Sequence, residues 1–222
     1  MEMYKYGVMI YSSLLNPEAI ILQAFPQAEG WPFPFYYGSC GRVIVEEYAG
    51  KTLSHYEDSS WEQRIDISYQ LLLIAQTLTE NASNFSLYMT DVTMDNFAVR
   101  SDGTVLLIDV ESIVIVDRLA NKEGQNTKIH HSKGEFCKDC LNFSFEDLCG
   151  SYQSDHNYYA ICKGLLVPGS YFSSKGFLHS IPENINIQTK LSYLVQECAS
   201  PSETNNRFKV LPKLLQVMKS LL

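Results

Sequence analysis

Residues 86–112 of the 222-residue chain read SLYMTDVTMDNFAVRSDGTVLLIDVES. Within them, two short apolar runs flank the dipeptide Asp102-Gly103. An Asp-Gly pair between two apolar, β-prone runs is typical of a tight β-hairpin. Asn96 would stand at the entrance of this hairpin and Asp109 at its exit. We therefore predict that the side chains of these two residues return to one place.

Asp91 stands five positions before Asn96, and with Asp109 these residues form a set of oxygen-bearing side chains. Phosphoryl transfer needs such a set, because one carboxylate orients the attacking hydroxyl while an amide and a second carboxylate hold Mg²⁺ against the phosphates. We predict that Asp91 is catalytic and that Asn96 and Asp109 bind the metal. The spacing alone leaves one alternative open, an ordinary hairpin with polar ends.

The same residues resemble the catalytic and metal-binding loops of protein kinases, which read His-Arg-Asp-x-x-x-x-Asn and Asp-Phe-Gly. Here the first loop reads Met89-Thr90-Asp91 with Asn96 at the same spacing, and the second reads Asp109-Val110-Glu111. The Asp and Asn residues are kept, whereas the His, Arg, Phe and Gly are not. A kinase-like site is therefore the first hypothesis for this chain.

The composition is that of one globular domain, since 45% of the residues are hydrophobic and 12% are aromatic, enough for a sizeable core. The formal net charge is −8, so no basic surface favours nucleic acid or anionic lipid. The longest apolar run, Leu71–Ala75, is far shorter than the roughly 20 residues that a membrane-spanning helix needs. We expect neither a nucleic-acid partner nor a transmembrane segment.

Six cysteines and three Asn-x-Ser tripeptides favour the secretory pathway, with disulfides and N-linked glycans. The cysteines, whose pairing stays open, are Cys40, Cys137, Cys140, Cys149, Cys162 and Cys198. The acceptor asparagines are Asn81, Asn84 and Asn142. One alternative is a zinc site that combines Cys137-x-x-Cys140 with His130 and His131, and another is a redox pair at the same two cysteines.

Hydrophobic periodicity and turn residues outline the elements around this centre. We predict strands at 35–41, 42–48 and 113–117, and helices at 61–78, from 155, and on both sides of Ser200-Pro201. Ser59 or Ser60 would cap the helix that begins at Trp61. Asn16-Pro17 would interrupt a helical N-terminal segment and start a second short helix.

Three stretches narrow the resemblance: WPFPFYYGSCGR at 31–42, DVTMDNFAV at 91–99 and DHNYYAIC at 155–162. They resemble the divergent protein kinase domain family 2, also called the deleted-in-autism family. The resemblance covers nearly the whole chain. It implies an α+β, protein-kinase-like fold, disulfides, and passage through the endoplasmic reticulum and Golgi to secretion.

In kinase terms, residues 1–50 would be a remnant of the small lobe, with two or three strands and the hinge, and residues 51–222 would be the helical large lobe. The hinge would run from Glu46 to Gly50, and the backbone of Glu46, Glu47 and Tyr48 would contact the adenine of ATP. Asp155 would open a buried helix and hydrogen-bond the backbone of the catalytic loop. A plain helix cap is the alternative role for Asp155.

Residues 1–34 contain neither a Gly-x-Gly-x-x-Gly phosphate loop nor a lysine embedded in a strand. Residues 1–5 also lack the pattern that begins a signal peptide. We therefore expect a truncated or alternatively started form of a secretory protein, with cytoplasmic retention as the alternative location. Such a form would be catalytically incompetent and would bind no nucleotide tightly.

Two functions follow from the resemblance. In the first, the chain acts as a secreted signalling or binding protein with a protein receptor. In the alternative, the full-length parent is an active protein kinase that depends on ATP and on Mg²⁺ or Mn²⁺ and acts on a protein substrate.

Overall fold

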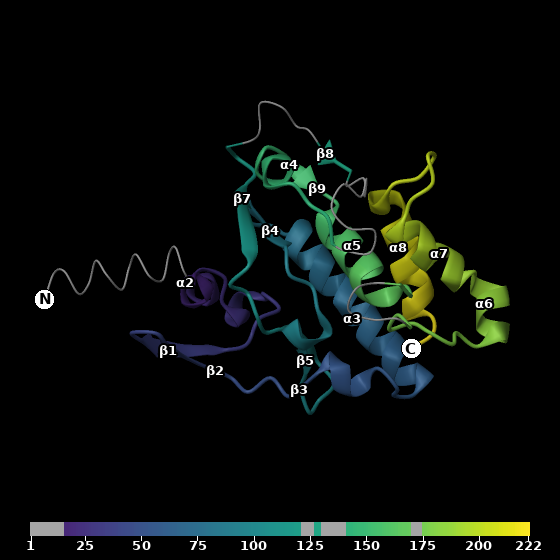
Figure 1. Ribbon diagram of the computed structural model, residues 1–222, viewed down its shortest axis with the longest axis horizontal. Coiled ribbons are helices and arrows are strands. Elements are labelled where there is room, and N and C mark those ends of the chain that lie inside the picture. Colours follow the sequence, from purple (N-terminus) through teal and green to yellow (C-terminus); the bar gives the residue numbers. More distant parts are fainter. Residues whose placement is uncertain (1–15, 121–126, 130–140, 170–174) are drawn as a thin grey trace, which may run out of the picture.

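The computed structural model describes residues 16–120, 127–129, 141–169 and 175–222 (Figure 1). The helices are α2 (Glu18–Ala24), α3 (Trp61–Thr79), α4 (Phe145–Cys149), α5 (His156–Ile161), α6 (Glu183–Thr189), α7 (Leu191–Ala199) and α8 (Arg207–Lys219). Short 3-10 turns are η1 (Gln27–Glu29), η2 (Leu53–Tyr56) and η3 (Met94–Asn96), and a π-helical turn, η4 (Cys162–Leu166), continues α5. The strands are β1 (Tyr36–Cys40), β2 (Val43–Glu46), β3 (Lys51–Thr52), β4 (Phe85–Met89), β5 (Phe97–Val99), β6 (Val105–Leu107), β7 (Ile113–Asp117), β8 (Thr127–Lys128) and β9 (Gln153–Ser154).

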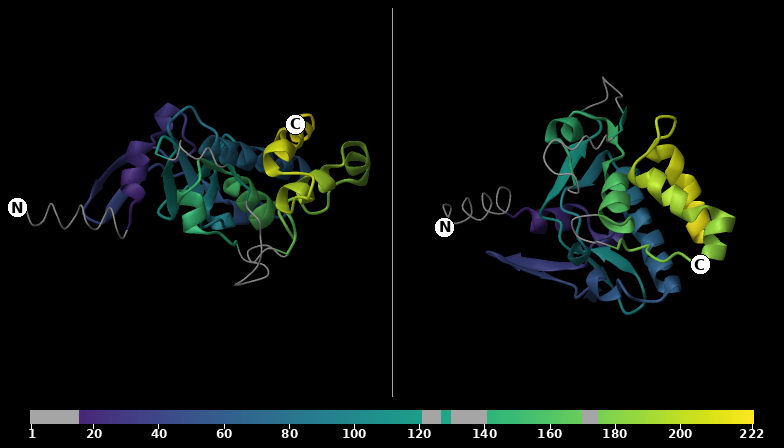
Figure 2. Two further views of the ribbon diagram at one scale, coloured as in Figure 1. Left: turned by 90° about the horizontal axis from the view of Figure 1, so that it is seen from above. Right: turned by 45° about the vertical axis from the view of Figure 1, so that its right-hand side comes forward.

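The elements are arranged from a small β end to a helical end (Figure 1). The hairpin β1–β2 and helix α2 lie at one end, and α6, α7 and α8 lie at the other. Helices α3 and α5 and the sheets β3-β5-β6 and β4-β7 lie between them. Figure 2 shows the same order from two further directions. The candidate loop at 90–96 therefore lies between the β end and the helical end.

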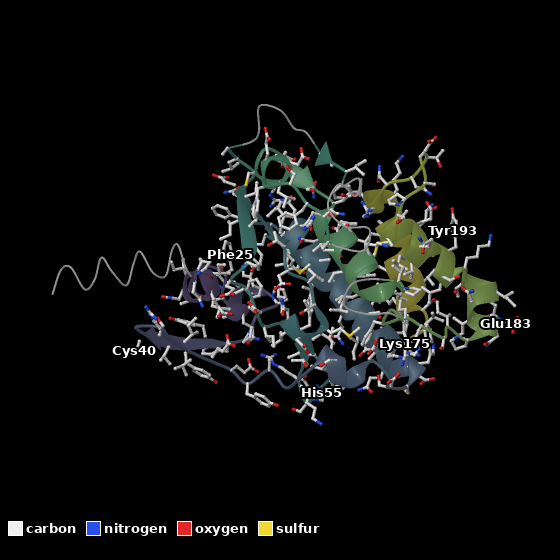
Figure 3. All side chains as sticks on the ribbon, viewed as in Figure 1. Phe25, Cys40, His55, Lys175, Glu183 and Tyr193 are labelled. Atoms are coloured by element: carbon white, nitrogen blue, oxygen red, sulfur yellow. A yellow bond between two sulfur atoms is a disulfide. The ribbon has the colours of Figure 1, made fainter. Side chains whose placement is uncertain are left out.

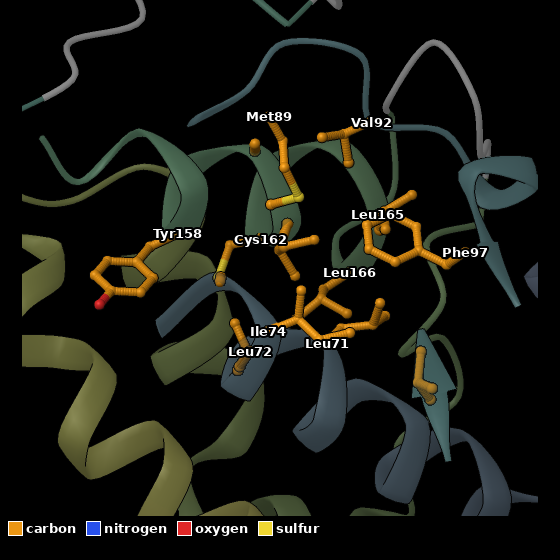
Figure 4. Close-up of a cluster of buried hydrophobic side chains, with 14 of the residues drawn as sticks. Leu71, Leu72, Ile74, Met89, Val92, Phe97, Tyr158, Cys162, Leu165 and Leu166 are labelled. Carbon is orange, nitrogen blue, oxygen red and sulfur yellow. The ribbon is translucent and has the colours of Figure 1, made fainter. Parts of the chain in front are cut away.

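Helix α3 is the centre of the hydrophobic core. Its N-cap is Ser60, whose Oγ accepts a hydrogen bond from the N–H of Gln63 (3.3 Å), so the predicted helix and one of its two predicted caps are confirmed. Figure 4 shows part of this core, with Leu71, Leu72, Ile74, Met89, Val92, Phe97, Tyr158, Cys162, Leu165 and Leu166 labelled. Because the buried Val92 belongs to this core, the core anchors the loop directly beside Asp91.

The predicted hairpin is present as β5 and β6, which pair antiparallel with Phe97 opposite Leu107. Its turn closes through a hydrogen bond from the N–H of Gly103 to the carbonyl oxygen of Arg100 (3.0 Å). Gly103 has φ +90°, a backbone conformation that glycine adopts at little cost. Strand β3 pairs with the outer edge of β5, which makes a three-stranded sheet.

Strand β4 delivers the chain into the candidate loop, and its partner is β7. The two strands pair antiparallel, with Phe85 opposite Asp117 and Met89 opposite Ile113, so the predicted strand at 113–117 is confirmed. Beyond the pair, the hydroxyl of Thr90 donates to the carbonyl oxygen of Ser112 (2.6 Å). This contact keeps the residue before Asp91 close to the segment that follows Asp109.

A disulfide ties the two helical segments that follow the candidate site. Cys162, at the start of η4, is bonded to Cys198 on α7, and both side chains are buried. The predicted C-terminal helices are present as α7 and α8, and the chain between them passes through Ser200-Pro201. The hydrophobic core thus continues from α3 to the C-terminal end.

Candidate functional site

The side chain of Asn96 closes the loop between β4 and β5. Its Nδ2 donates to the carbonyl oxygen of Asp91 (3.2 Å), and its Oδ1 accepts from the hydroxyl of Thr93 (2.9 Å). The backbone N–H of Ile108 donates to the carbonyl oxygen of Asn96 (2.9 Å), which places Asp109 beside this loop. The structure therefore brings the backbone of the three predicted site residues together, and their roles in phosphoryl transfer stay predictions.

Exposure differs among the three residues. Asp91 and Asp109 are exposed, whereas Asn96 is 8% exposed. An amide oxygen carries two lone pairs, so the Oδ1 of Asn96 can accept from Thr93 and still face a cation. Carboxylate and amide oxygens are the donors that Mg²⁺ and Mn²⁺ prefer. The donor set of Asn96 and Asp109 therefore fits the predicted metal.

Asp95, next to Asn96, holds the loop against the segment that follows the β1–β2 hairpin. Its Oδ1 accepts hydrogen bonds from the hydroxyl of Thr52 (3.1 Å) and from the hydroxyl of Ser54 (2.8 Å). Thr52 ends β3 and Ser54 lies in η2. Asp95 thus connects two segments about 40 residues apart in sequence and shapes the loop.

Glu18, which no sequence motif marks, reaches the site from the start of α2. Its Oε1 accepts a long hydrogen bond from the N–H of Val110 (3.4 Å). Burial is the main cause that raises the pKa of Glu18 to about 7, and the charges of Glu46, Asp109 and Glu111 act in the same direction. Its helix begins at the predicted Asn16-Pro17 start, where Asn16 Oδ1 accepts from the N–H of Glu18 (3.0 Å).

Glu46 adds a second carboxylate from the end of β2. Burial and the charge of Asp109 raise its pKa, and its Oε2 is buried with no hydrogen-bond partner among the described residues. Within the described ranges, no basic side chain forms an ion pair with Glu18, Glu46 or Asp109. The same ranges contain no group of three or more His, Cys, Asp or Glu residues that could hold a metal.

The chain just before the loop is held by the first turn of α5. The Nε2 of His156 lies 2.7 Å from the carbonyl oxygen of Met89, and the Oδ1 of Asn157 accepts from the N–H of Met89 (2.9 Å). The Nδ2 of Asn157 also donates to the hydroxyl of Thr79 (2.9 Å) and to the carbonyl oxygen of Leu87 (2.8 Å). Two buried side chains therefore fix both backbone polar groups of Met89.

The sequence of this chain also matches known proteins. Residues 10–201 match the sequence model of the protein-kinase domain of FAM69. The chain belongs to this family. The predicted resemblance and the predicted kinase-like fold class are therefore confirmed.

The relatives carry the name that the sequence motifs predicted. The chain is 39% identical to divergent protein kinase domain 2A of Xenopus tropicalis, and the match covers 96% of this chain and 52% of the relative. It is 38% identical to the human 2A protein, with 96% and 51% covered, and 32% identical to divergent protein kinase domain 2B of Mus musculus, with 71% and 36% covered. The chain thus spans about half the length of the 2A relatives.

In this kinase-like domain, the contact between the α5 motif and the catalytic loop differs from the expected one. Asp155 opens α5 as predicted, but its Oδ2 accepts from Nη1 of Arg207 on α8 (3.1 Å), and both side chains are buried. Arg207 also donates to the carbonyl oxygens of Cys198 and Ala199. The bonds to the backbone before Asp91 come from the next two residues, His156 and Asn157.

The predicted kinase hinge, Glu46 to Gly50, begins at the last residue of β2. The N–H of Glu47 already donates to the carbonyl oxygen of Phe35 (2.8 Å). The carboxylate of Glu47 forms a bidentate ion pair with Arg100, and this hydrogen bonding lowers the pKa of Glu47. Tyr48 is 83% exposed. Glu47 therefore ties the hinge to the β5–β6 hairpin, and the adenine contact of these residues stays a prediction.

The predicted cysteine and asparagine sites are spread over the molecule. Cys162 and Cys198 form the disulfide described above, whereas Cys137, Cys140, His130 and His131 lie outside the described residues. Cys40 is exposed at the outer end of β1 (Figure 3) and pairs with no cysteine of the described chain. Cys149 ends α4 and is exposed. Asn142 is partly buried, and its N–H donates to the hydroxyl of Tyr159 (3.3 Å).

Among the described helices, none is long and apolar enough to cross a membrane.

Proposed function

We propose that this kinase-like chain enters the secretory pathway and acts as a secreted signalling or binding protein, without transferring phosphoryl groups by itself. One observation supports this proposal most directly. Glu18, Glu46 and Asp109 form a carboxylate cluster at the candidate site, and no described basic side chain pairs with them.

Kinase catalysis depends on the opposite electrostatic arrangement. An ion pair between a lysine and a helical glutamate, together with a metal-bound aspartate, must be in place to position the phosphates. Glu18 lies on a helix and contacts the residue after Asp109. Burial raises its pKa to about 7, and within the described residues no basic side chain forms an ion pair with it. A site with this charge repels nucleotide phosphates unless a cation binds first.

The second candidate function is ATP- and Mg²⁺-dependent protein phosphorylation by a longer form of the protein. The observation that favours it is the donor set, since Asn96 Oδ1 and the carboxylate of Asp109 would hold the metal. A bound Mg²⁺ or Mn²⁺ would neutralise the phosphate charge that develops during transfer. Asp91, exposed at the entrance of the loop, would accept the proton of the substrate hydroxyl. Backbone groups of the hinge would bind the adenine.

The route through the endoplasmic reticulum and Golgi, with glycosylation, rests on cysteine chemistry and on the acceptor tripeptides. A buried disulfide such as Cys162–Cys198 forms and persists in oxidising compartments. Asn-x-Ser tripeptides at Asn81, Asn84 and Asn142 are substrates for N-glycosylation in the same compartments. Both features are consistent with a secreted glycoprotein.

Thermal unfolding with Mg²⁺ or Mn²⁺, with and without ATP, tests the two candidates. A ligand at about 100 times its Kd stabilises a protein by roughly 2.7 kcal/mol, a clear rise in Tm. We expect millimolar metal to stabilise this chain modestly, and ATP·Mg²⁺ to add nothing. A further rise with ATP that Asp109→Asn abolishes would overturn the proposed incompetence. Asp102→Asn, at the other end of the same hairpin, is the matched control because asparagine can still accept from the N–H of Thr104.

A second experiment separates a binding role from an enzymatic one. The secreted full-length protein is applied to responsive cells as wild type and as the double variant Asp91→Asn, Asp109→Asn. An unchanged cellular response supports the signalling role, because both exposed carboxylates lie outside the core. Loss of the response, with unchanged secretion and Tm, supports phosphoryl transfer instead.

A further inference from the structure

Two glycosylation tripeptides, Asn81-Ala82-Ser83 and Asn84-Phe85-Ser86, follow each other directly in the connection between α3 and β4. We propose that the folded protein carries an N-linked glycan at Asn84 and none at Asn81. This inference rests on the proposed passage through the secretory pathway, and it assigns the modification to one of two adjacent acceptors. The structure distinguishes them by what each side-chain amide already does.

The amide of Asn81 is fully used in closing the connection. Its Nδ2 donates to the carbonyl oxygen of Thr77 (3.0 Å) and to the carbonyl oxygen of Phe85 (3.0 Å). Its Oδ1 accepts from the N–H of Ser83 (2.9 Å) and from the hydroxyl of the same residue. Since an amide NH₂ has two donors, both hydrogens of Asn81 Nδ2 are committed to backbone oxygens.

Further hydrogen bonds hold the backbone around that nitrogen. Arg118 donates to the carbonyl oxygens of Asn81 (2.8 Å) and Ser83, and the N–H of Phe85 donates to the hydroxyl of Ser83 (3.1 Å). Asn81 is also only partly exposed. A substituent on Nδ2 would have to occupy the position of one of the two carbonyl oxygens about 3 Å away.

Asn84 presents the opposite situation. It is exposed, and only its backbone takes part in the connection, where its carbonyl oxygen accepts from the N–H of Arg118 (2.8 Å). Within the described residues, no hydrogen bond to its side-chain amide is present. A glycan attached there points into solvent and breaks no contact of the fold.

The chemistry of attachment shows why folding would select between the two. The transfer forms a bond between Nδ2 of the asparagine and C1 of a lipid-linked oligosaccharide, breaks the bond from C1 to the lipid pyrophosphate, and releases one proton from Nδ2. Ser86 of the second tripeptide is buried in the fold, where its hydroxyl donates to Thr79. The transfer therefore precedes folding, when both acceptors are accessible. A chain modified at Asn81 then lacks one N–H donor and cannot close the turn.

The test is a site-resolved glycan map of the folded protein. The full chain is expressed behind a cleavable signal peptide, so that entry into the endoplasmic reticulum is enforced, and the secreted folded fraction is treated with N-glycosidase in ¹⁸O-water. Tandem mass spectrometry should find the isotope label at Asn84 and not at Asn81. A label at Asn81 in the folded fraction, or its absence at Asn84, would overturn the proposal.

Two variants provide matched controls. Asn84→Gln should remove one glycan from the secreted protein and leave its Tm after deglycosylation unchanged. Asn81→Gln should keep that glycan and lower the Tm, because the turn loses its closing amide. The reverse pattern would contradict the assignment. Expression without the added signal peptide tests the secretory route separately, since glycan-free protein in that experiment alone would count against the route and not against the choice of site.

Discussion

The Nε2 atom of His156 lies 2.7 Å from the carbonyl oxygen of Met89, two residues before Asp91. Burial lowers the pKa of His156 to about 4, so the imidazole is neutral at physiological pH. A neutral imidazole that faces a carbonyl oxygen through Nε2 carries its proton on that nitrogen. The rings of Tyr88, Phe143 and Tyr159 surround it. The backbone just before the candidate loop is thus held by a histidine that must stay uncharged.

The first prediction concerns acid stability. His156 has a pKa of 6.5 when unfolded and about 4 when folded, so the unfolded state binds the proton more readily between these values. The free energy of unfolding therefore decreases as pH falls from 6.5 to 4, by about 3 kcal/mol. In His156→Gln this part of the pH dependence should disappear, which urea unfolding at several pH values measures. His55→Gln, at an exposed position, should keep the wild-type slope, and the same slope in both variants would contradict the prediction.

The second prediction concerns Gly50, the last residue of the predicted hinge. Gly50 has φ +102°, and a Cβ added there would lie 2.0 Å from the carbonyl oxygen of Val99. Gly50→Ala should therefore destabilise the protein by about 3 kcal/mol or more, because strain and a backbone clash add. Gly30→Ala has a similar φ of +91° with nothing within 4 Å of the added Cβ, so it should cost only about 1 kcal/mol. If chemical denaturation shows that Gly50→Ala and Gly30→Ala lose equal free energy of unfolding, the predicted clash at Gly50 is wrong.

The third prediction concerns the disulfide, which joins residues 36 positions apart. A cross-link that closes a loop of this length reduces the conformational entropy of the unfolded chain. The loop-entropy relation gives about 3–4 kcal/mol of stabilisation for it. The double variant Cys162→Ser, Cys198→Ser should lose this amount under oxidising conditions, measured by urea unfolding. Cys40→Ser replaces an exposed thiol at the end of the β1–β2 hairpin and should leave the free energy of unfolding unchanged. A reductant should lower the free energy of unfolding of the wild type by at least this amount.

Local sequence signals predicted the centre of the site, because the elements there are made by neighbouring residues. The hairpin depends on Asp102-Gly103, and α3 depends on its own periodicity and on Ser60, all of which can be read within about 20 residues. The hydrogen bonds that join Asn96 to Asp91 and to Ile108 then follow from that hairpin. The kinase-like fold could be predicted from the sequence for the same reason.

Contacts between segments that are distant in the sequence could not be predicted from it. The motif at 155–162 predicted that Asp155 would hold the catalytic loop, yet which residue of a helix turn faces the loop depends on the rotation of the helix. Here Arg207, 52 residues later, pairs with Asp155, and His156 and Asn157 then face Met89. The position of Glu18 against Val110, 92 residues away, likewise depends on how α2 packs. No local pattern encodes either contact.

The fourth prediction concerns Glu18. Its pKa rises from 4.5 to about 7 on folding, so the folded state binds a proton more readily than the unfolded state between these values. The stabilisation from the protonated carboxyl is complete below pH 4.5 and is lost as pH rises through 7. Because Glu18 is partly exposed, screening reduces the effect to about 1–2 kcal/mol. Glu18→Gln keeps a neutral amide at all pH values and should stabilise the protein at pH 8 relative to wild type.

At pH 5 the two proteins should be nearly equal in stability, because wild-type Glu18 is then mostly protonated and resembles glutamine in charge. Thermal unfolding at pH 5 and pH 8 measures the difference, and Glu29→Gln, at an exposed position of η1, should show no pH-dependent gain. Mg²⁺ or Mn²⁺ at pH 8 should narrow the gap between wild type and Glu18→Gln, since a cation near Asp109 offsets the same like-charge repulsion. A Glu18→Gln protein less stable than wild type at pH 8 would mean that the carboxylate is paired with a cation in solution.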